Sequence, residues 1–193
     1  MKNKVAVFVC GSGGSGKTTF VNDFFMEFEK VNVDIPYEKL LKDSGLGVKI
    51  SDFNKTQSLK ASEFFERAKD ISYNTLLKSI EMGKNIVIDT VGRDIDLIQK
   101  QREKLHLNGY KTIMFILYVP LDVCIKRVEG RDRVYDESIT IDSWYLSYGN
   151  IVNFKREFLN DFHLIYNDEI VNTREKVPIL LEELMRNPNN KYL

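Results

Sequence analysis

The chain lacks the features that mark a secreted, membrane-spanning or nucleic-acid-coating protein. Its 28 basic and 28 acidic side chains leave no net charge over 193 residues. A domain that holds long nucleic acid by bulk charge is usually basic, so this balance argues against that role and leaves only a local basic groove open. No apolar run reaches the length of about 18 residues that a membrane span needs, and no signal peptide fits before the first motif. We therefore expect a soluble, cytoplasmic protein with no membrane partner.

Cysteine is scarce as well. Cys10 and Cys124 are the two cysteines of the sequence, and both lie in apolar surroundings. Such a pair is more typical of small core residues in a reducing compartment than of a disulfide or a metal site. Hydrophobic residues make up 43% of the chain, enough for one sizeable core. The length fits a single domain.

The strongest motif is the glycine-rich segment over residues 11–18, which matches the phosphate-binding pattern G-x-x-x-x-G-K-[ST]. An apolar run over residues 5–10 predicts a buried strand before it, and phenylalanines at helical spacing predict a helix of about fifteen residues after it. Backbone N–H groups and the helix N-terminus would then face a triphosphate. We predict ATP contacts at Gly11, Ser12, Gly13, Gly14, Ser15, Gly16, Lys17, Thr18 and Thr19.

Within this motif two side chains carry distinct chemistry. Lys17 is expected to reach the β- and γ-phosphates and so to act in catalysis, and the Thr18 hydroxyl is expected to bind Mg²⁺.

Strands and helices alternate along the rest of the chain. We predict strands over 31–33, 86–89, 112–119 and 164–166, and helices over 61–80, 95–105, 121–128, 144–158 and 177–185, with a polar tail over 187–193. This alternation predicts an α/β fold of three layers, a parallel sheet with helices on both faces. Ligands of such folds bind at the carboxyl ends of the strands.

Asp89 ends a predicted strand at that edge, where nucleotide-binding folds carry the carboxylate that holds Mg²⁺. A turn-forming aspartate is the alternative. Thr90 follows in place of the glutamate that activates water in many ATPases. Residues 89–92 also match the D-x-x-G of GTP-binding switches, but the chain has no guanine-reading N-K-x-D, since residues 54–57 lack its aspartate. Transfer to an acceptor other than water therefore explains the pattern better.

Asp34 directly follows the second predicted strand and should return to the sheet edge near the γ-phosphate. A carboxylate there can orient an acceptor hydroxyl and take its proton. The alternative is a strand-terminal aspartate that caps a turn before Pro36.

Dense charge around Gly130 resembles a mobile lid over residues 127–137. Arg127, Arg131 and Arg133 are candidates to stabilise the transferring phosphoryl group, because guanidinium planes pair bidentately with phosphate. The alternative is a solvated run of mixed charge.

Taken together, the phosphate loop, residues 32–34, residues 87–90 and the arginine-rich segment resemble the zeta-toxin and polynucleotide-kinase-like P-loop kinases. Residues 109–121, with the arginines after them and Trp144, look most like small zeta-toxin-like kinases encoded by phages. The resemblance spans most of residues 4–168. It implies a single P-loop kinase domain over 1–193 that uses ATP and Mg²⁺.

By the same resemblance Asp34 holds the family's base position, and Arg131 or Arg133 the lid position. The chain is shorter than typical zeta toxins and shows no phosphatase domain like that of the two-domain polynucleotide kinases. The resemblance therefore supports the reaction better than the acceptor.

An ATP-dependent kinase acting on a hydroxyl is the favoured function. A hydrolysing switch and a nucleotide-binding module without chemistry are the alternatives. The acceptor stays open among a nucleotide, a nucleic-acid end, a hydroxymethylated pyrimidine in DNA and a sugar nucleotide. Residues 36–70 are expected to build its site with basic and aromatic side chains. These side chains could equally form a helical cap with surface lysines and core phenylalanines.

Overall fold

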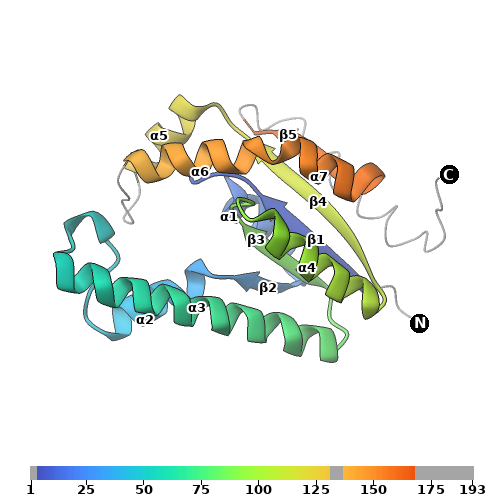
Figure 1. Cartoon of the computed structure of the whole chain (residues 1–193), viewed down its shortest axis with the longest axis horizontal. Helices are drawn as coiled ribbons and strands as arrows, with labels where there is room; N and C mark the ends of the chain where they lie inside the picture. The colour runs from blue at the N-terminus through green and yellow to red at the C-terminus, as the bar shows by residue number, and fades with distance from the viewer. Residues whose placement is uncertain (1–3, 131–136, 168–193) are drawn as a thin grey trace.

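The computed structural model of the protein describes residues 4–130 and 137–167. Its centre is a sheet of parallel strands in the order β2-β3-β1-β4-β5 (Figure 1). The strands are β1 Lys4–Cys10, β2 Glu29–Asn32, β3 Ile86–Thr90, β4 Tyr110–Tyr118 and β5 Phe162–Tyr166. Because β1 is the central strand, the loop that follows it opens at the middle of the carboxyl edge, where such sheets bind ligands.

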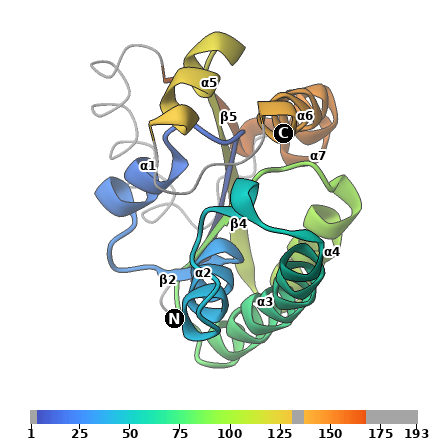
Figure 2. The same ribbon diagram turned by 90° about the vertical axis from the view of Figure 1, so that its left-hand side faces the viewer.

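Helices cover both faces of this sheet (Figures 1 and 2). Side chains of α1 pack on one face, and side chains of α3, α4, α6 and α7 pack on the other. The predicted three-layer α/β fold is therefore confirmed. The helices are α1 Lys17–Phe24, α2 Asp34–Asp43, α3 Lys55–Glu81, α4 Ile95–Leu107, α5 Leu121–Glu129, α6 Glu137–Gly149 and α7 Ile151–Phe158, with 3-10 turns at Ile50–Asp52 and Leu159–Asp161.

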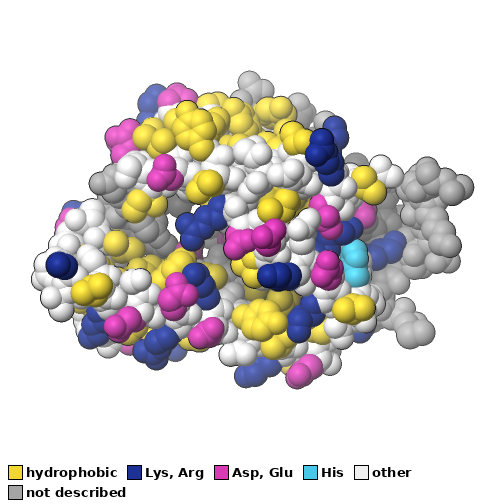
Figure 3. Space-filling model, in the orientation of Figure 1, with side chains coloured by type: hydrophobic (Ala, Val, Ile, Leu, Met, Phe, Trp, Pro, Cys, Tyr) yellow, Lys and Arg dark blue, Asp and Glu magenta, His cyan; other side chains and the backbone are white. Residues whose placement is uncertain are grey.

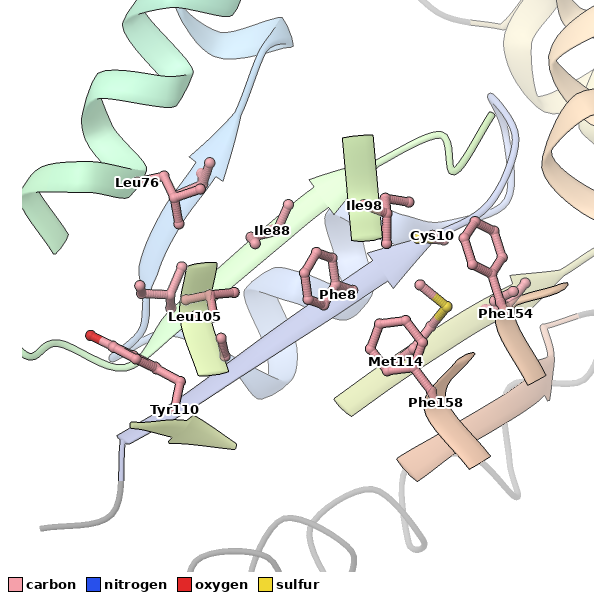
Figure 4. Packing of buried hydrophobic residues seen from close by; sticks show 14 of the residues in the cluster. Phe8, Cys10, Leu76, Ile88, Ile98, Leu105, Tyr110, Met114, Phe154 and Phe158 are labelled. Atoms are coloured by element: carbon pink, nitrogen blue, oxygen red, sulfur yellow. The ribbon is translucent and has the colours of Figure 1, made fainter. Parts of the chain in front are cut away.

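Strand β1 contributes to two separate cores. Val7 and Val9 face α1, whereas Phe8 and Cys10 face the helices on the other side. Figure 4 shows this second core, in which the rings of Phe8 and Phe158 meet edge to face with centroids 5.5 Å apart. Both faces of the strand are buried, which explains why its sequence is a continuous apolar run rather than an alternating one.

Helix α1 is shorter than the sequence predicts. It ends at Phe24 after 8 residues, where the spacing of phenylalanines predicts about fifteen. Phe25 leaves helical geometry and is fully buried, with its ring centroid 5.9 Å from that of Phe20 and 6.3 Å from that of Phe115. Phe28 packs on Phe25 from the following turn. The helical spacing therefore reflects a shared core and not one long helix.

The single helix predicted over 144–158 is two helices. Helix α6 ends at Gly149 and α7 begins at Ile151. At the break, Asn150 Nδ2 donates to the carbonyls of Gly92 at 3.2 Å and Arg93 at 3.0 Å. These bonds tie the break to the loop after β3, which the apolar periodicity of the helices could not reveal.

Helices α2 and α3 form an arm with a small core of its own, made of Tyr37, Leu41, Ala61, Phe64 and Ala68. Helix α3 begins with a capping box, in which Asn54 and Gln57 each accept from the backbone N–H of the other. In Figure 1 the arm extends past the carboxyl edge of the sheet, and both views place it on the side opposite α5 and α6 (Figures 1 and 2).

Some predictions fall outside the described residues. These are the roles of Arg131 and Arg133, most of the lid over 127–137, the helix over 177–185 and the tail over 187–193. Within residues 4–130 and 137–167, no helix combines the length and the apolar character that crossing a membrane requires.

Candidate active site

The loop between β1 and α1 has a backbone that only glycine adopts easily. Gly14 and Gly16 have φ angles of 79° and 89°. A Cβ atom on Gly14 would lie 2.6 Å from the carbonyl oxygen of Cys124, and one on Gly11 would lie 2.7 Å from that of Leu117. The loop therefore passes closely over neighbouring backbone and delivers the chain to the N-terminus of α1, where an anion is favoured.

Gly14→Ala is expected to destabilise the protein and weaken its binding of nucleoside triphosphate. The alanine would have to adopt a φ of 79°, and its Cβ atom would lie only 2.6 Å from the carbonyl oxygen of Cys124. The left-handed conformation alone costs about 1–2 kcal/mol for alanine, and the collision adds to it. Urea unfolding with and without ATP measures both effects.

Two other glycines separate strain from collision. Gly45 has a φ of 75° but no atom within 4 Å of an added Cβ, so Gly45→Ala tests backbone strain alone. Gly149 has open space and no positive φ, so Gly149→Ala should leave stability unchanged or slightly raised. If Gly14→Ala destabilises no more than Gly45→Ala, the close approach to Cys124 is not a constraint.

Lys17, the first residue of α1, folds back over the loop. Its amine donates to the carbonyl of Gly11 at 2.6 Å and to that of Ser12 at 2.8 Å. This is the position from which the motif predicts contact with the β- and γ-phosphates. The side chain is therefore held beside the loop.

The polar groups around the loop suit a triphosphate with a magnesium ion. Thr18 and Thr19 are exposed in the first turn of α1. Among the described side chains, the buried Ser15 hydroxyl has no hydrogen-bond partner. The same residues contain no cluster of three or more His, Cys, Asp or Glu that would hold a metal alone. Mg²⁺ is usually held by one or two protein groups and by phosphate oxygens, so Thr18 and Asp89 fit an ion that arrives with the nucleotide.

Asp89 and Asp34 lie at the carboxyl edge of the sheet, from which the loop after β1 also extends. Asp89 lies opposite Asn32 in the pairing of β3 with β2, and Asn32 Nδ2 donates to Asp89 Oδ2 at 2.9 Å. The pKa of Asp89 is raised above its usual value, chiefly by burial. The charge of Asp34 also raises it, whereas the charge of Lys17 and the hydrogen bond from Asn32 lower it. Asp34 itself is exposed at the first position of α2. The charges of Lys17 and Asp34 therefore both act on the Asp89 carboxyl group.

Arg127 contacts the loop from α5. Its Nη1 donates to the carbonyl of Gly14 at 3.3 Å, and its Nη2 donates to that of Asn167 at 3.4 Å. Asn167, just after β5, donates its side-chain amide to the carbonyl of Ser15 at 2.7 Å. Arg127 and Asn167 thus brace the loop together, and a contact of Arg127 with the transferring phosphoryl group stays a prediction.

Helix α6 also holds the loop, which sequence reasoning missed. Tyr148 donates to the carbonyl of Leu117 at 2.7 Å, and its hydroxyl lies 3.3 Å from Ser12 Oγ. Trp144 Nε1 donates to the carbonyl of Val119 at 2.8 Å. The partners are 25 to 136 residues apart in the chain, so no local pattern reveals them.

Cys10 lies just before the loop, and both it and Cys124 are buried free thiols, as predicted. Burial raises the pKa of Cys10 from 9.0 to about 12. The folded protein then holds the thiol proton more tightly than the unfolded chain does. The contribution of Cys10 to the free energy of unfolding is therefore complete below about pH 9 and is lost between about pH 9 and 12. We expect the free energy of unfolding in urea to fall over this range, by up to about 1.4 kcal/mol per pH unit from this group.

Cys10→Ala is the matched test, because it removes the titrating thiol and should flatten the alkaline slope. Burial also raises the pKa of Tyr110 and Tyr148, so part of the slope should remain in the variant. A slope unchanged by Cys10→Ala would assign the alkaline loss to other groups.

A hollow of about 240 Å³ lies where β2, α2 and α3 meet. Asn32 and Ile35, which flank Asp34 in sequence, both line it, together with Lys30, Pro36, Lys39, Ile71, Ser72 and Thr75. The predicted acceptor region over 36–70 therefore supplies only part of this lining, and the rest comes from the end of β2 and from α3 beyond residue 70.

The aromatic side chains of the predicted acceptor region are mostly core. Tyr37 and Phe64 are buried between α2 and α3, and Phe65 meets Tyr37 edge to face with centroids 5.3 Å apart. Lys60 and Arg67 both lie 5.7 Å from the centroid of Phe64. These rings pack within the arm instead of presenting a face on which a base could stack.

Comparisons with known proteins agree with this geometry. The family model described as Zeta toxin matches residues 1–139. A comparison with curated proteins gives no match. Among solved structures, a candidate kinase from Chloroflexus aurantiacus j-10-fl is 16% identical with a TM-score of 0.66, over 94% of this chain and 98% of that one. Shikimate kinase from Bacteroides thetaiotaomicron is 18% identical with a TM-score of 0.52, over 93% and 98%.

A third structure, the AvrRxo1-ORF1:AvrRxo1-ORF2 complex with ATP, is 16% identical with a TM-score of 0.60, over 100% of this chain and 66% of that one. At these identities the structures show the P-loop kinase fold, which confirms the predicted fold class. The family model spans well over half of the sequence and includes the phosphate loop, Asp34 and Asp89. The chain therefore belongs to the zeta toxin family and is a P-loop phosphotransferase.

Proposed function

We propose that the protein binds ATP with Mg²⁺ at residues 11–19 and transfers the γ-phosphoryl group to a hydroxyl of an acceptor. The observation that carries this proposal is that Lys17, Asp34 and Asp89 follow or end three adjacent parallel strands, β1, β2 and β3, at the carboxyl edge of the sheet. The AvrRxo1 structure with ATP supports ATP as the donor. Its likeness to this chain extends over the whole fold.

Each charged group has a separate task in this proposal. Lys17 binds the β- and γ-phosphates. Thr18 and Asp89 would hold Mg²⁺, which would neutralise charge on the phosphate oxygens. Asp34 takes the proton of the acceptor hydroxyl. The oxygen of that hydroxyl bonds to the γ-phosphorus while the bond between the γ-phosphorus and ADP breaks. Arg131, Arg133 and Arg127 are proposed to stabilise the charge on the transferring group.

The acceptor is proposed to be a small molecule that carries phosphate, either a nucleotide or a sugar nucleotide. Lys30 and Lys39 line the hollow next to Asp34 and offer positive charge to such a group. On the face drawn in Figure 3, basic and acidic side chains alternate among the coloured residues, which suits a small acceptor better than a long nucleic acid. A nucleic-acid end or a modified pyrimidine in DNA is the competing acceptor.

Transfer of the labelled γ-phosphate of ATP to a panel of acceptors tests the proposal. The panel holds nucleosides, nucleotides, sugar nucleotides, 5′-hydroxyl oligonucleotides and DNA with hydroxymethylated pyrimidines. We expect slow turnover of ATP alone and fast transfer to one phosphorylated small molecule. Slow hydrolysis that no acceptor accelerates would instead favour a nucleotide-hydrolysing switch, and transfer to oligonucleotides alone would overturn the proposed acceptor class.

A further inference from the structure

Asn32 uses both polar atoms of its side chain to connect two parts of the site. Its Nδ2 donates to Asp89 Oδ2 at 2.9 Å, across from β2 to β3. Its Oδ1 accepts from the backbone N–H of Ile35 at 3.0 Å, in the first turn of α2. One amide therefore joins the carboxylate at the end of β3 to the turn that begins with Asp34.

The bond to Ile35 matters because the N-cap residue of α2 supplies no side-chain hydrogen bond. Val33 occupies the N-cap position and makes no side-chain hydrogen bond. The first N–H groups of a helix need partners from outside the helix. Asn32, at the end of β2, supplies one such partner to the N–H of Ile35. This bond restrains the direction in which α2 leaves the sheet and the position of Asp34, the first residue of α2.

The bond to Asp89 matters because a carboxylate at a strand end can rotate about its terminal bond. An N–H donor on one oxygen restrains the plane of the group and leaves the second oxygen outside this bond. Partners of this kind, one step removed from a metal, typically change metal affinity or activity by about 10- to 100-fold when they are lost.

We infer that Asn32 is a positioning residue that holds Asp89 and Asp34 in a fixed relation through its one amide group. The inference rests on the proposed function, because it gives Asp89 the magnesium ion and Asp34 the proton. Asn32 itself binds neither of them. Its effect must therefore pass through Asp89, and this dependence is measurable.

Two variants separate the two bonds. Asn32→Ala removes both, whereas Asn32→Ser keeps an oxygen that can accept from the Ile35 N–H but has no amide arm to reach Asp89. Hydrogen exchange in the nucleotide-free protein should show the Ile35 amide protected in the wild type and in Asn32→Ser, and exposed in Asn32→Ala. This readout requires no metal and no activity.

Calorimetric titration with ATP, in Mg²⁺ and in EDTA, measures the second bond. The ratio of ATP affinity in Mg²⁺ to ATP affinity in EDTA should be about 10-fold smaller in both Asn32 variants than in the wild type. The affinity in EDTA should be unchanged. In an Asp89→Ala background, Asn32→Ser should have no further effect, because its target is gone. Asn108→Ser, an exposed position at the end of α4 away from the loop, is the matched control and should bind like the wild type.

Wild-type Mg²⁺ dependence in Asn32→Ser would overturn the inference and leave Asn32 as a helix cap only. A loss in Asn32→Ser that persists in the Asp89→Ala background would also overturn it, because the effect would not pass through Asp89. If Asp89→Ala alone keeps the wild-type Mg²⁺ dependence, the proposed metal role of Asp89 fails and the inference fails with it. A protein that binds ATP with these Mg²⁺ effects but phosphorylates no acceptor overturns the proposed kinase activity alone.

Discussion

Phosphoryl transfer should fall by at least about 10²–10³-fold in Lys17→Ala, the usual effect of removing one preorganised donor from a site of developing charge. The Lys17 amine lies over the loop, on the carbonyls of Gly11 and Ser12, and is the positive side chain that the motif assigns to the β- and γ-phosphates. Affinity for ATP should fall with it. Calorimetry gives the affinity, and transfer of labelled phosphate gives the rate.

Lys84→Ala is the matched control for this experiment. Lys84 pairs with Glu29 at 2.7 Å, at the amino end of β2, on the opposite edge of the sheet from the loop. This variant should bind ATP and transfer phosphate like the wild type. Lys17→Ala should keep the far-ultraviolet circular dichroism of the folded protein, so a loss of activity would not be due to unfolding. Wild-type turnover in this variant would refute the assignment of residues 11–18 as a phosphate-binding loop.

Asp34→Asn should lower the transfer rate by about 10²-fold or more, within the usual range for loss of a general base. The change keeps the size and polarity of the side chain but removes its ability to accept a proton. Asp34 is exposed at the start of α2, so the fold should tolerate the amide. ATP affinity should change little, because Asp34 is not assigned to the nucleotide. Single-turnover rates with a saturating acceptor separate the chemical step from binding.

Asp43→Asn tests whether any loss of negative charge on α2 has the same effect. Asp43 is exposed at the last position of the same helix, far along the chain from Asp34 and its neighbours. It should leave transfer unchanged. If Asp34→Asn unfolds the protein or abolishes ATP binding, Asp34 is structural or a metal ligand, and its role as base is wrong.

Features set by local geometry could be predicted from the sequence. The loop needs glycine where φ is positive. The helices predicted over 61–80 and 95–105 end at Glu81 and Leu107, just before Gly83 and Gly109, which have φ angles of 63° and 78°. The parallel sheet with helices on both faces followed from the alternation of apolar runs with helical periods. These signals depend on neighbours in the chain, and therefore one sequence was enough to predict them.

The bonds that hold the site could not be predicted in the same way. In the sequence, Asn32 is the polar middle residue of the strand predicted over 31–33, and its partner Asp89 is 57 residues away. Asn167 follows the last described strand, and its bond to Ser15 spans 152 residues. Such contacts depend on which strands lie side by side and on where each one ends. The pairing of β2 with β3 sets the first, and the return of β5 beside β4 sets the second.

The central place of β1 has a consequence for synthesis on the ribosome. Its pairing partners are β3 at Ile86–Thr90 and β4 at Tyr110–Tyr118. At about 5–20 residues per second, roughly 5–20 s pass between the emergence of β1 and that of β4. Throughout this interval an apolar segment rich in β-branched residues lacks at least one of its two neighbours, and such segments are prone to aggregate. The nascent chain should therefore depend on chaperones most strongly before residue 118 has left the exit tunnel.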